Sequence, residues 1–283
     1  SNVCFMSSKI RQTAKMTSNR YKIAVVMITL NAPYWQYAKL CIQSLRKFFL
    51  KGHELDFILW TDMPKEQSNE LGATIIFTEP FEWPLPTLYR YHLFLREAER
   101  LKDYDFIYYC DSDMLAVSRV GDEVLGKDLT AAQHPMYAIR REYIPPYEPN
   151  EKSTAFIPRP GRVIEESGKK RFEPLYFAGG FQGGTSTAYL SAMEVMRDMI
   201  DKDFTKNGYI PIWNDETVWN KYLFEHPPST VLSPSYVYPD SLVKNYYMKI
   251  WGRNYVPRIV TITKPFSFTQ GAGAHLQGTL QTL

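Results

Sequence analysis

Cysteine and long apolar runs are scarce in this sequence, and both shortages narrow the class of protein. Its three cysteines show no spacing typical of a metal site or a disulfide framework. Cys41 and Cys110 lie in apolar runs, so we interpret them as buried thiols of a reducing compartment. No stretch approaches about 18 consecutive apolar residues, the length that a membrane-spanning helix needs, so we expect no transmembrane segment.

The net charge is also small, and histidines are few. A net charge of +3 is too small to indicate a nucleic-acid-binding protein, and the cationic run 169–171 is expected to be a solvated loop. None of the five histidines stands in a cluster with metal-ligand spacing, which counts against a metal-dependent phosphohydrolase. The length of 283 residues allows one large α/β domain or two small ones.

The first 20 residues are polar, basic and without periodicity. They lack the apolar stretch of a secretory signal, and the first residue is not Met, which is compatible with processing of a longer chain. We predict that residues 1–20 form a flexible arm and that residues 21–283 form a single catalytic domain.

From Tyr21 onward the pattern alternates between strands and helices. Continuous β-branched runs predict strands, and apolar residues at helical spacing predict helices. The expected strands are 22–30, 54–62, 73–78 and the run ending at 110, and the expected helices are 34–50 and 88–101. This rhythm predicts a mostly parallel sheet with helices on both faces. Two proline-rich stretches, 78–87 and 143–161, interrupt it and are expected to be mobile or functional loops.

The apolar run Phe106–Cys110 ends abruptly at two aspartates, Asp111 and Asp113. Ionised carboxylates are costly near a core unless they are paired or bound to a cation. At the carboxyl end of a strand in an open α/β sheet, such a pair points into the crevice where ligands bind. We therefore predict that Asp111 and Asp113 hold Mn²⁺, or Mg²⁺, and that the cation binds a diphosphate. The alternative is a strand followed by a simple Asx turn.

Two further segments have the composition of a site. The tract 177–185 carries two Gly-Gly pairs, which indicates either close approach of a ligand or a plain loop. In the segment 212–223, Asn214 is a candidate helix N-cap, and Asp215 and Glu216 suit the first turn of a helix. The same two acids are also candidates for stabilising positive charge on a reacting sugar.

Taken in order, the motifs D-S-D-M, H-P near 134, A-F-I-P, G-G-F-x-G-G, W-x-D-E and V-L-S-P resemble those of glycosyltransferase family 6. The resemblance runs from about Tyr34 to Lys264. It implies a GT-A fold with a nucleotide-binding half (about 21–115), an acceptor-binding half (about 116–265) and a C-terminal tail that closes over the donor. It also implies transfer of N-acetylgalactosamine (GalNAc) or galactose from a UDP-sugar to O3 of a terminal β-galactoside, with retention of the α configuration.

The resemblance assigns roles to individual residues. Asp111 and Asp113 match the D-x-D motif that binds the metal. Glu216 matches the proposed nucleophile or stabiliser, which also lies on the acceptor side. The other residues implied to bind the donor are Ile28, Tyr34, Arg90, Ala178, Gly179, Gly180, Asp215, Arg258 and Lys264. The last two resemble basic residues of the tail that close over the diphosphate. On the acceptor side the resemblance points to His134 and Trp213.

The sequence leaves three questions open. Gly180, at the third position of the donor-selecting tract, favours UDP-GalNAc, with UDP-galactose as the alternative. Asn214 and the Pro239-Asp240 pair depart from the family pattern on the acceptor side, so the acceptor glycan is undefined. An inactive sugar-nucleotide-binding protein on the same fold is the alternative of another class. Because the D-x-D is kept without an anchor, we expect a soluble, cytoplasmic microbial or phage enzyme, or else a truncated Golgi-lumen one.

Overall fold

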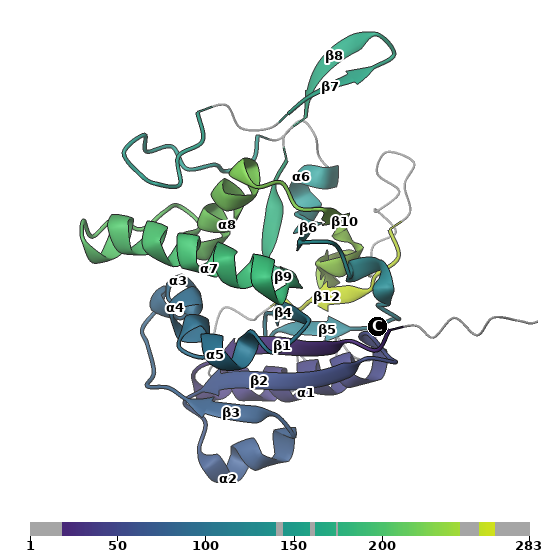
Figure 1. The fold of residues 1–283 in the computed structure, drawn as a ribbon, viewed down its shortest axis with the longest axis vertical. Helices are drawn as coiled ribbons and strands as arrows, with labels where there is room; N and C mark the ends of the chain where they lie inside the picture. Colours follow the sequence, from purple (N-terminus) through teal and green to yellow (C-terminus); the bar gives the residue numbers. More distant parts are fainter. Residues whose placement is uncertain (1–18, 140–143, 159–161, 174, 244–254, 264–283) are drawn as a thin grey trace, which may run out of the picture.

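A seven-stranded mixed sheet runs through the centre of the protein (Figure 1). The computed structural model describes residues 19–139, 144–158, 162–173, 175–243 and 255–263. In spatial order the strands are β10 (Thr230–Leu232), β6 (Leu129–Gln133), β9 (Phe177–Thr185), β4 (Phe106–Cys110), β1 (Lys22–Thr29), β2 (Glu54–Thr61) and β3 (Thr74–Phe77). Neighbouring strands are parallel except where β9 pairs antiparallel with β4 and β6.

Helices cover both faces of this sheet. The long ones are α1 (Ala32–Phe48), α7 (Ser186–Ile200) and α8 (Asn214–Glu225). The shorter ones are α2 (Lys65–Ser68), α3 (Leu85–Leu88), α4 (Arg90–Leu95), α5 (Ala98–Leu101), α6 (Pro135–Ile139) and α9 (Asp240–Val243), with a π-helical turn at Asp201–Thr205. This arrangement confirms the predicted α/β fold of GT-A type, with a mostly parallel sheet.

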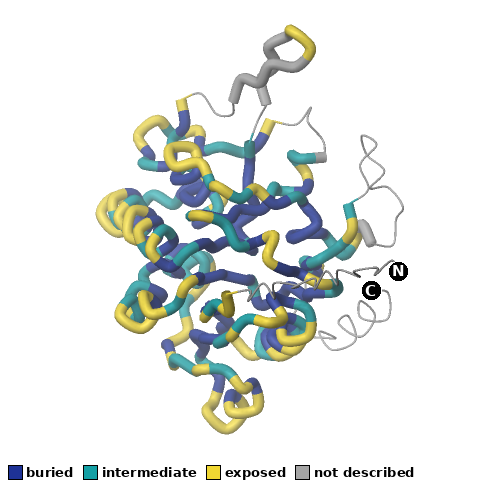
Figure 2. The backbone as a smooth tube through the Cα atoms, turned by 45° about the vertical axis from the view of Figure 1, so that its right-hand side comes forward, coloured by how far each residue is buried: buried dark blue, intermediate teal, exposed yellow. Residues whose placement is uncertain are grey.

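Strand β1 shows why the central strands read as continuous apolar runs. Its alternate residues Ile23 and Val25 pack into the core beneath α1, whereas Ala24 and Val26 pack into the core beneath α4, α7 and α8. Because successive side chains of a strand point to opposite faces, a strand covered on both sides has no polar face. Figure 2 shows these buried strands in the centre of the molecule, with exposed backbone concentrated at its periphery.

Two small sheets stand apart from the large one. Strands β11 (Tyr238–Pro239), β12 (Ile259–Thr261) and β5 (Met114–Ala116) form a three-stranded sheet directly after the Asp111–Asp113 motif. Strands β7 (Arg162–Glu166) and β8 (Lys169–Glu173) form a hairpin that projects from the body of the protein (Figure 1). The expectation of a loop at 169–171 was therefore wrong, because these residues pair with β7.

The expected helix at 88–101 was also wrong in its continuity. The structure divides it into α3, α4 and α5, with Tyr89 and Glu97 at the interruptions. Both residues have ψ angles near zero (12° and 20°), outside the α-helical range, and each precedes a new helical turn. The apolar periodicity identified the buried face correctly, but it did not indicate these two interruptions of the helix.

The glycine tract 177–185 is a central strand, so the plain-loop interpretation was wrong. A Cβ atom at Gly183 would lie 2.3 Å from the carbonyl oxygen of Ile107, and one at Gly184 would lie 2.1 Å from that of Asp128. These two glycines therefore allow β9 to approach its neighbours closely. The first pair, Gly179 and Gly180, has a different role, because it faces the cavity described below.

Strand β12 changes how the C-terminal tail should be tested. Ile259 and Val260 are fully buried, and β12 pairs with β5 next to the aspartate motif. A truncation starting at Arg258 would remove this core strand, so a test of the predicted closing tail has to leave residues up to Thr263 in place.

Lys264 and the rest of the tail lie outside the described residues, as does most of the predicted arm at 1–20. The predicted division into two halves stays a prediction. Among the described residues, no helix has the length and apolarity to cross a membrane.

Candidate active site

A cavity of about 410 Å³ opens where β1 and β4 end. The carboxyl ends of parallel strands meet at one edge of the sheet, and β9 adds its glycines there. Most of the predicted site residues line this cavity: Ile28, Tyr34, Arg90, Asp111, Asp113, Gly179, Gly180, Trp213, Asp215 and Glu216. The sequence therefore brings together residues that are up to 188 positions apart, from Ile28 to Glu216.

Asp111 and Asp113 lie on the wall formed by the end of β4. The backbone N–H of Asp111 donates to the carbonyl of Gly180 at 2.8 Å, which fixes the motif against β9. The Tyr109 hydroxyl donates to Oδ1 of Asp111. The side chain of Asp111 is about one-third exposed, whereas Asp113 is buried. Both carboxylates border the cavity, as expected for the end of a buried strand.

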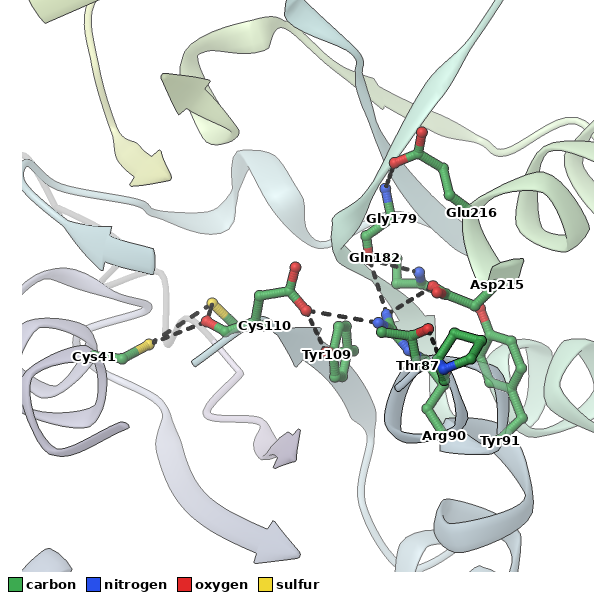
Figure 3. Close-up of polar contacts among 12 residues, drawn as sticks. Cys41, Thr87, Arg90, Tyr91, Tyr109, Cys110, Gly179, Gln182, Asp215 and Glu216 are labelled. Carbon is green, nitrogen blue, oxygen red and sulfur yellow. Dashed lines mark hydrogen bonds and ion pairs between the residues drawn. The ribbon is translucent and has the colours of Figure 1, made fainter. Parts of the chain in front are cut away.

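Arg90 is a buried cation between two carboxylates. Its Nη1 lies 3.0 Å from Oδ2 of Asp215, and its Nη2 lies 3.6 Å from Oδ1 of Asp111. The guanidinium also donates to the carbonyl of Gly179 at 3.1 Å and stacks 4.1 Å from the centre of the Tyr109 ring (Figure 3). Burial alone would lower the pKa of Arg90, but the combined attraction of Asp215, Tyr109 and Asp111 outweighs burial, so the pKa is raised and the guanidinium stays charged. Arg90 thus links the two acidic motifs.

Asp215 and Glu216 enter the cavity from the start of α8, on the opposite side. Burial raises the pKa of Asp215 to about 6, although Arg90 acts to lower it. Burial also raises the pKa of Glu216 to about 7, against the hydrogen bond that Gly179 N–H donates to its Oε2 at 2.8 Å. Repulsion from Asp215 and Asp111 adds to the shift in Glu216. A carboxylate held by one backbone donor and surrounded by other acids is poised for charge stabilisation.

The predicted N-cap at Asn214 was wrong. Asn214 is the first residue of α8, Trp213 occupies the cap position, and no side chain caps the helix. Asn214 has φ of 52°, in the left-handed region that Asn tolerates better than most residues. The structure thus gives a turn with an unusual backbone conformation directly before the two acids, which is typical of functional sites.

The raised pKa of Glu216 leads to a prediction about stability. A pKa of about 7 in the folded protein, against about 4.5 in the unfolded chain, means that the folded state binds the proton more tightly. Stability from this group is fully present below pH 4.5 and is lost as pH rises through 7. In metal-free protein, Glu216→Gln should therefore gain stability relative to wild type between pH 5 and 8, by about 1–3 kcal/mol. Urea unfolding at several pH values measures this, with Glu225→Gln at the end of α8 as control. If the difference in unfolding free energy between Glu216→Gln and wild type does not vary with pH, the raised pKa of Glu216 is contradicted.

The pair Asp111 and Asp113 fits a hard divalent cation. Mg²⁺ and Mn²⁺ are commonly held by one or two carboxylates and complete their coordination with water and substrate phosphates. Two carboxylates at the border of an open cavity provide such a partial set of oxygen ligands. Within the part of the chain that the structure describes, no group of three or more His, Cys, Asp or Glu residues forms a complete protein site. The donor set therefore suits a cation shared with a ligand.

Three predicted residues lie away from the cavity lining. Ala178 is buried in the core beneath α1 and is not among the residues that line the cavity. His134 packs in an aromatic group with Tyr137 and Tyr176, where burial lowers its pKa to about 4 and keeps the ring neutral at pH 7. Arg258 donates to the carbonyl of Arg119 at 2.8 Å. Their assigned roles in binding stay predictions, as does that of Lys264.

Three further residues that were not predicted from the sequence also line the cavity: Tyr109, Phe81 and Trp83. Tyr109 could have been found, because it precedes Asp111 by two residues on one strand and the period of two places both on the same face. Phe81 and Trp83 belong to the proline-rich stretch at 78–87, where no periodicity indicates direction. Trp83 is 73% exposed at the border of the cavity, so an aromatic surface is available to a ligand there.

The two buried thiols predicted from the sequence are confirmed. Cys41 and Cys110 are free and fully buried, and their sulfurs lie 3.9 Å apart.

Fold and cavity together define an α/β protein of GT-A type with an acidic pocket at the strand ends. The sequence model of glycosyltransferase family 6 matches residues 12–258, and the chain belongs to this family. It is 30% identical over 219 residues to the histo-blood group ABO system transferase 1 of Rattus norvegicus, covering 74% of this chain and 59% of the rat protein.

Other relatives come from different organisms. The globoside α-1,3-N-acetylgalactosaminyltransferase 1 of Homo sapiens is 27% identical, over 73% of this chain and 58% of the human protein. The O-antigen biosynthesis glycosyltransferase WbnI of Escherichia coli is 26% identical, over 65% of this chain and 73% of the bacterial protein. The matched part of the chain spans about three fifths of the length of the vertebrate relatives.

Proposed function

We propose that this protein is a retaining glycosyltransferase that moves GalNAc from UDP-GalNAc to O3 of a terminal β-galactoside in α linkage. The observation that carries the proposal is the pairing of two acidic motifs across one cavity, Asp111 with Asp113 and Asp215 with Glu216. One pair suits a cation and a diphosphate, and the other suits a sugar that develops positive charge. One of the relatives named above, the human protein, has a name that describes GalNAc transfer.

The residues on the two sides of the cavity have different roles. Asp111 and Asp113 would hold Mn²⁺ or Mg²⁺, which supplies a Lewis acid for the departing diphosphate. Arg90 keeps both acidic motifs in place, because its guanidinium pairs with Asp111 and Asp215 at once. Glu216, positioned by the N–H of Gly179, attacks or stabilises the anomeric carbon as the bond to UDP breaks. Retention follows if this carboxylate acts on the face opposite the leaving group.

Two alternatives are separated by one experiment. An inactive sugar-nucleotide-binding protein would bind UDP-GalNAc without turnover, and a galactosyltransferase would prefer UDP-galactose. The purified protein is incubated with each donor, Mn²⁺ and a panel of β-galactosides, and UDP release and glycan mass are measured. The proposal predicts a glycan product with UDP-GalNAc as the better donor. Binding of UDP-GalNAc without UDP release or product favours the inactive protein.

Donor choice is tested at Gly180. The absence of a side chain leaves room for the N-acetyl group, and a methyl block of this kind is worth about 1–3 kcal/mol. The structure adds a second effect, because a Cβ atom at Gly180 would lie 2.8 Å from Oδ2 of Asp111. Gly180→Ala is therefore expected to lower kcat with both donors while shifting the ratio of kcat/KM toward UDP-galactose by about 10–100-fold. The disturbance of Asp111 lowers the rate equally with both donors. The ratio of the two kcat/KM values therefore reports donor selectivity alone. A wild-type preference for UDP-galactose would refute the GalNAc assignment.

A further inference from the structure

Glu148 is a buried carboxylate outside the cavity, at 2% exposure. It lies in the irregular segment 144–158, which the sequence marks only as proline-rich. Its Oε2 accepts the backbone N–H of Ile212 at 2.9 Å, and its Oε1 accepts the N–H of Asn150 at 2.9 Å and the hydroxyl of Tyr209. A buried carboxylate with donors on both oxygens is tightly fixed in place.

The preceding residue, Tyr147, makes the complementary contact on the other side. Its hydroxyl donates to the carbonyl of Leu175 at 2.7 Å. Leu175 stands just before β9, and Ile212 stands just before α8. Two adjacent residues of one loop therefore connect the beginnings of the two elements that carry Gly179 and Glu216.

The segment that Glu148 holds leads directly into the turn before α8. After Ile212 the chain passes Trp213, whose N–H donates to the Thr217 hydroxyl at 3.0 Å, and Asn214, whose N–H donates to the carbonyl of Pro211 at 2.9 Å. The positive φ of Asn214 is an unfavourable backbone conformation that persists only where the surroundings hold it. A fixed N–H at Ile212 is part of that restraint.

We propose that Glu148 is a positioning residue that, with Tyr147, sets the placement of Glu216 against β9 for the transfer reaction. The inference rests on the proposed function for its kinetic consequence. Its structural consequence does not depend on the reaction. Loss of the Glu148 carboxylate loosens the 211–216 turn and the contact between Gly179 N–H and Glu216. In Glu148→Gln an NH₂ group replaces one of the two acceptor oxygens, so the side chain can no longer accept the Ile212 N–H on one oxygen and the Asn150 N–H on the other.

Asp203, in the π-helical turn Asp201–Thr205, provides a matched control because its carboxylate binds the same loop. It is also a buried carboxylate, at 4% exposure, and it accepts hydrogen bonds from the Ser153 hydroxyl and the Thr154 N–H. Its side chain ties the loop to the π-helical turn at the end of α7, and none of the hydrogen bonds described for this side chain reaches residues 211–216. Asp203→Asn should therefore reproduce the loss of loop stability without disturbing the 211–216 turn.

The test compares wild type, Glu148→Gln and Asp203→Asn in three measurements: melting temperature, UDP affinity by calorimetry, and kcat for transfer. We expect both variants to melt at lower temperature. Only Glu148→Gln should lose kcat, by about 10–100-fold, with UDP affinity changed less than about 3-fold, because a displacement of about 1 Å is enough to slow a reaction this much. An unchanged kcat in Glu148→Gln would overturn the proposal, and so would an equal loss of kcat in Asp203→Asn.

Two further experiments test the proposal even if wild type proves inactive or Glu148→Gln does not fold. Amide hydrogen exchange of residues 213–216 and of Gly179 should accelerate in Glu148→Gln and not in Asp203→Asn, even if wild type proves inactive; unchanged exchange would overturn the proposal. If Glu148→Gln does not fold, Tyr147→Phe removes only the hydrogen bond to Leu175. It should then lower kcat about 3–10-fold, the worth of one hydrogen bond, and an unchanged kcat in this variant would also overturn the proposal.

Discussion

Replacing Asp111 by Asn is expected to lower transfer from UDP-GalNAc by about 10²–10³-fold, the cost of losing one preorganised electrostatic contact to the leaving group. Asn keeps the size of the side chain and can still accept from the Tyr109 hydroxyl, so the fold should be retained. It removes the negative charge that pairs with Arg90 and that a divalent cation needs. Asp113→Asn should have an effect of the same order, because both carboxylates border the cavity.

The measurement is the transfer rate as a function of Mn²⁺, together with Mn²⁺ affinity by calorimetry in the presence of UDP. Wild-type activity should vanish with a chelator and return when Mn²⁺ is restored. Asp198→Asn, at an exposed position on α7 that pairs only with its neighbour Arg197 among the contacts described, serves as the control for loss of a carboxylate. Full wild-type activity in chelator would contradict the assignment of Asp111 and Asp113.

The second large effect is expected at Glu216. Glu216→Gln should lower kcat by at least about 10²-fold while UDP affinity stays within about 3-fold, because the carboxylate acts on the sugar as charge develops and not on the nucleotide. Gln retains an oxygen for the N–H of Gly179, so the geometry of the turn is kept. Together with the predicted gain of stability above pH 5, the variant should be less active and more stable than wild type.

Single-turnover transfer measures this prediction, with Glu225→Gln at the end of α8 as the control. A variant that loses UDP affinity and keeps its turnover would show that Glu216 only supports the start of the helix.

The sequence predicted the strands and the position of the two aspartates at the cavity for a physical reason. Burial on both faces makes the run 23–28 of β1 and all of β4 free of charged residues, so the two aspartates after β4 stand out as the end of the strand. Alternation of strand and helix then places that end at the edge where ligands bind. The resemblance to the family supplied Asp215 and Glu216, which local helix chemistry alone would also have explained.

Other features depend on contacts that are distant in sequence. The glycines of β9 look like a loop until the carbonyls of Ile107 in β4 and of Asp128, just before β6, are placed against them. Glu148 resembles any acid in a proline-rich loop, and only packing reveals that it holds Ile212. The same holds for Arg90, whose two carboxylate partners lie 21 and 125 residues away. Such pairings have no local pattern from which they could be predicted.

The central claim is retaining transfer from a UDP-sugar, and the configuration of the product tests it most directly. The protein is incubated with UDP-GalNAc, Mn²⁺ and a β-galactoside, and the new glycosidic linkage is determined by NMR. The account predicts an α-linked GalNAc on O3 of the galactose, formed by wild type and lost in Glu216→Gln. A β-linked product, or release of UDP and free GalNAc at the same rate with and without acceptor, would contradict it.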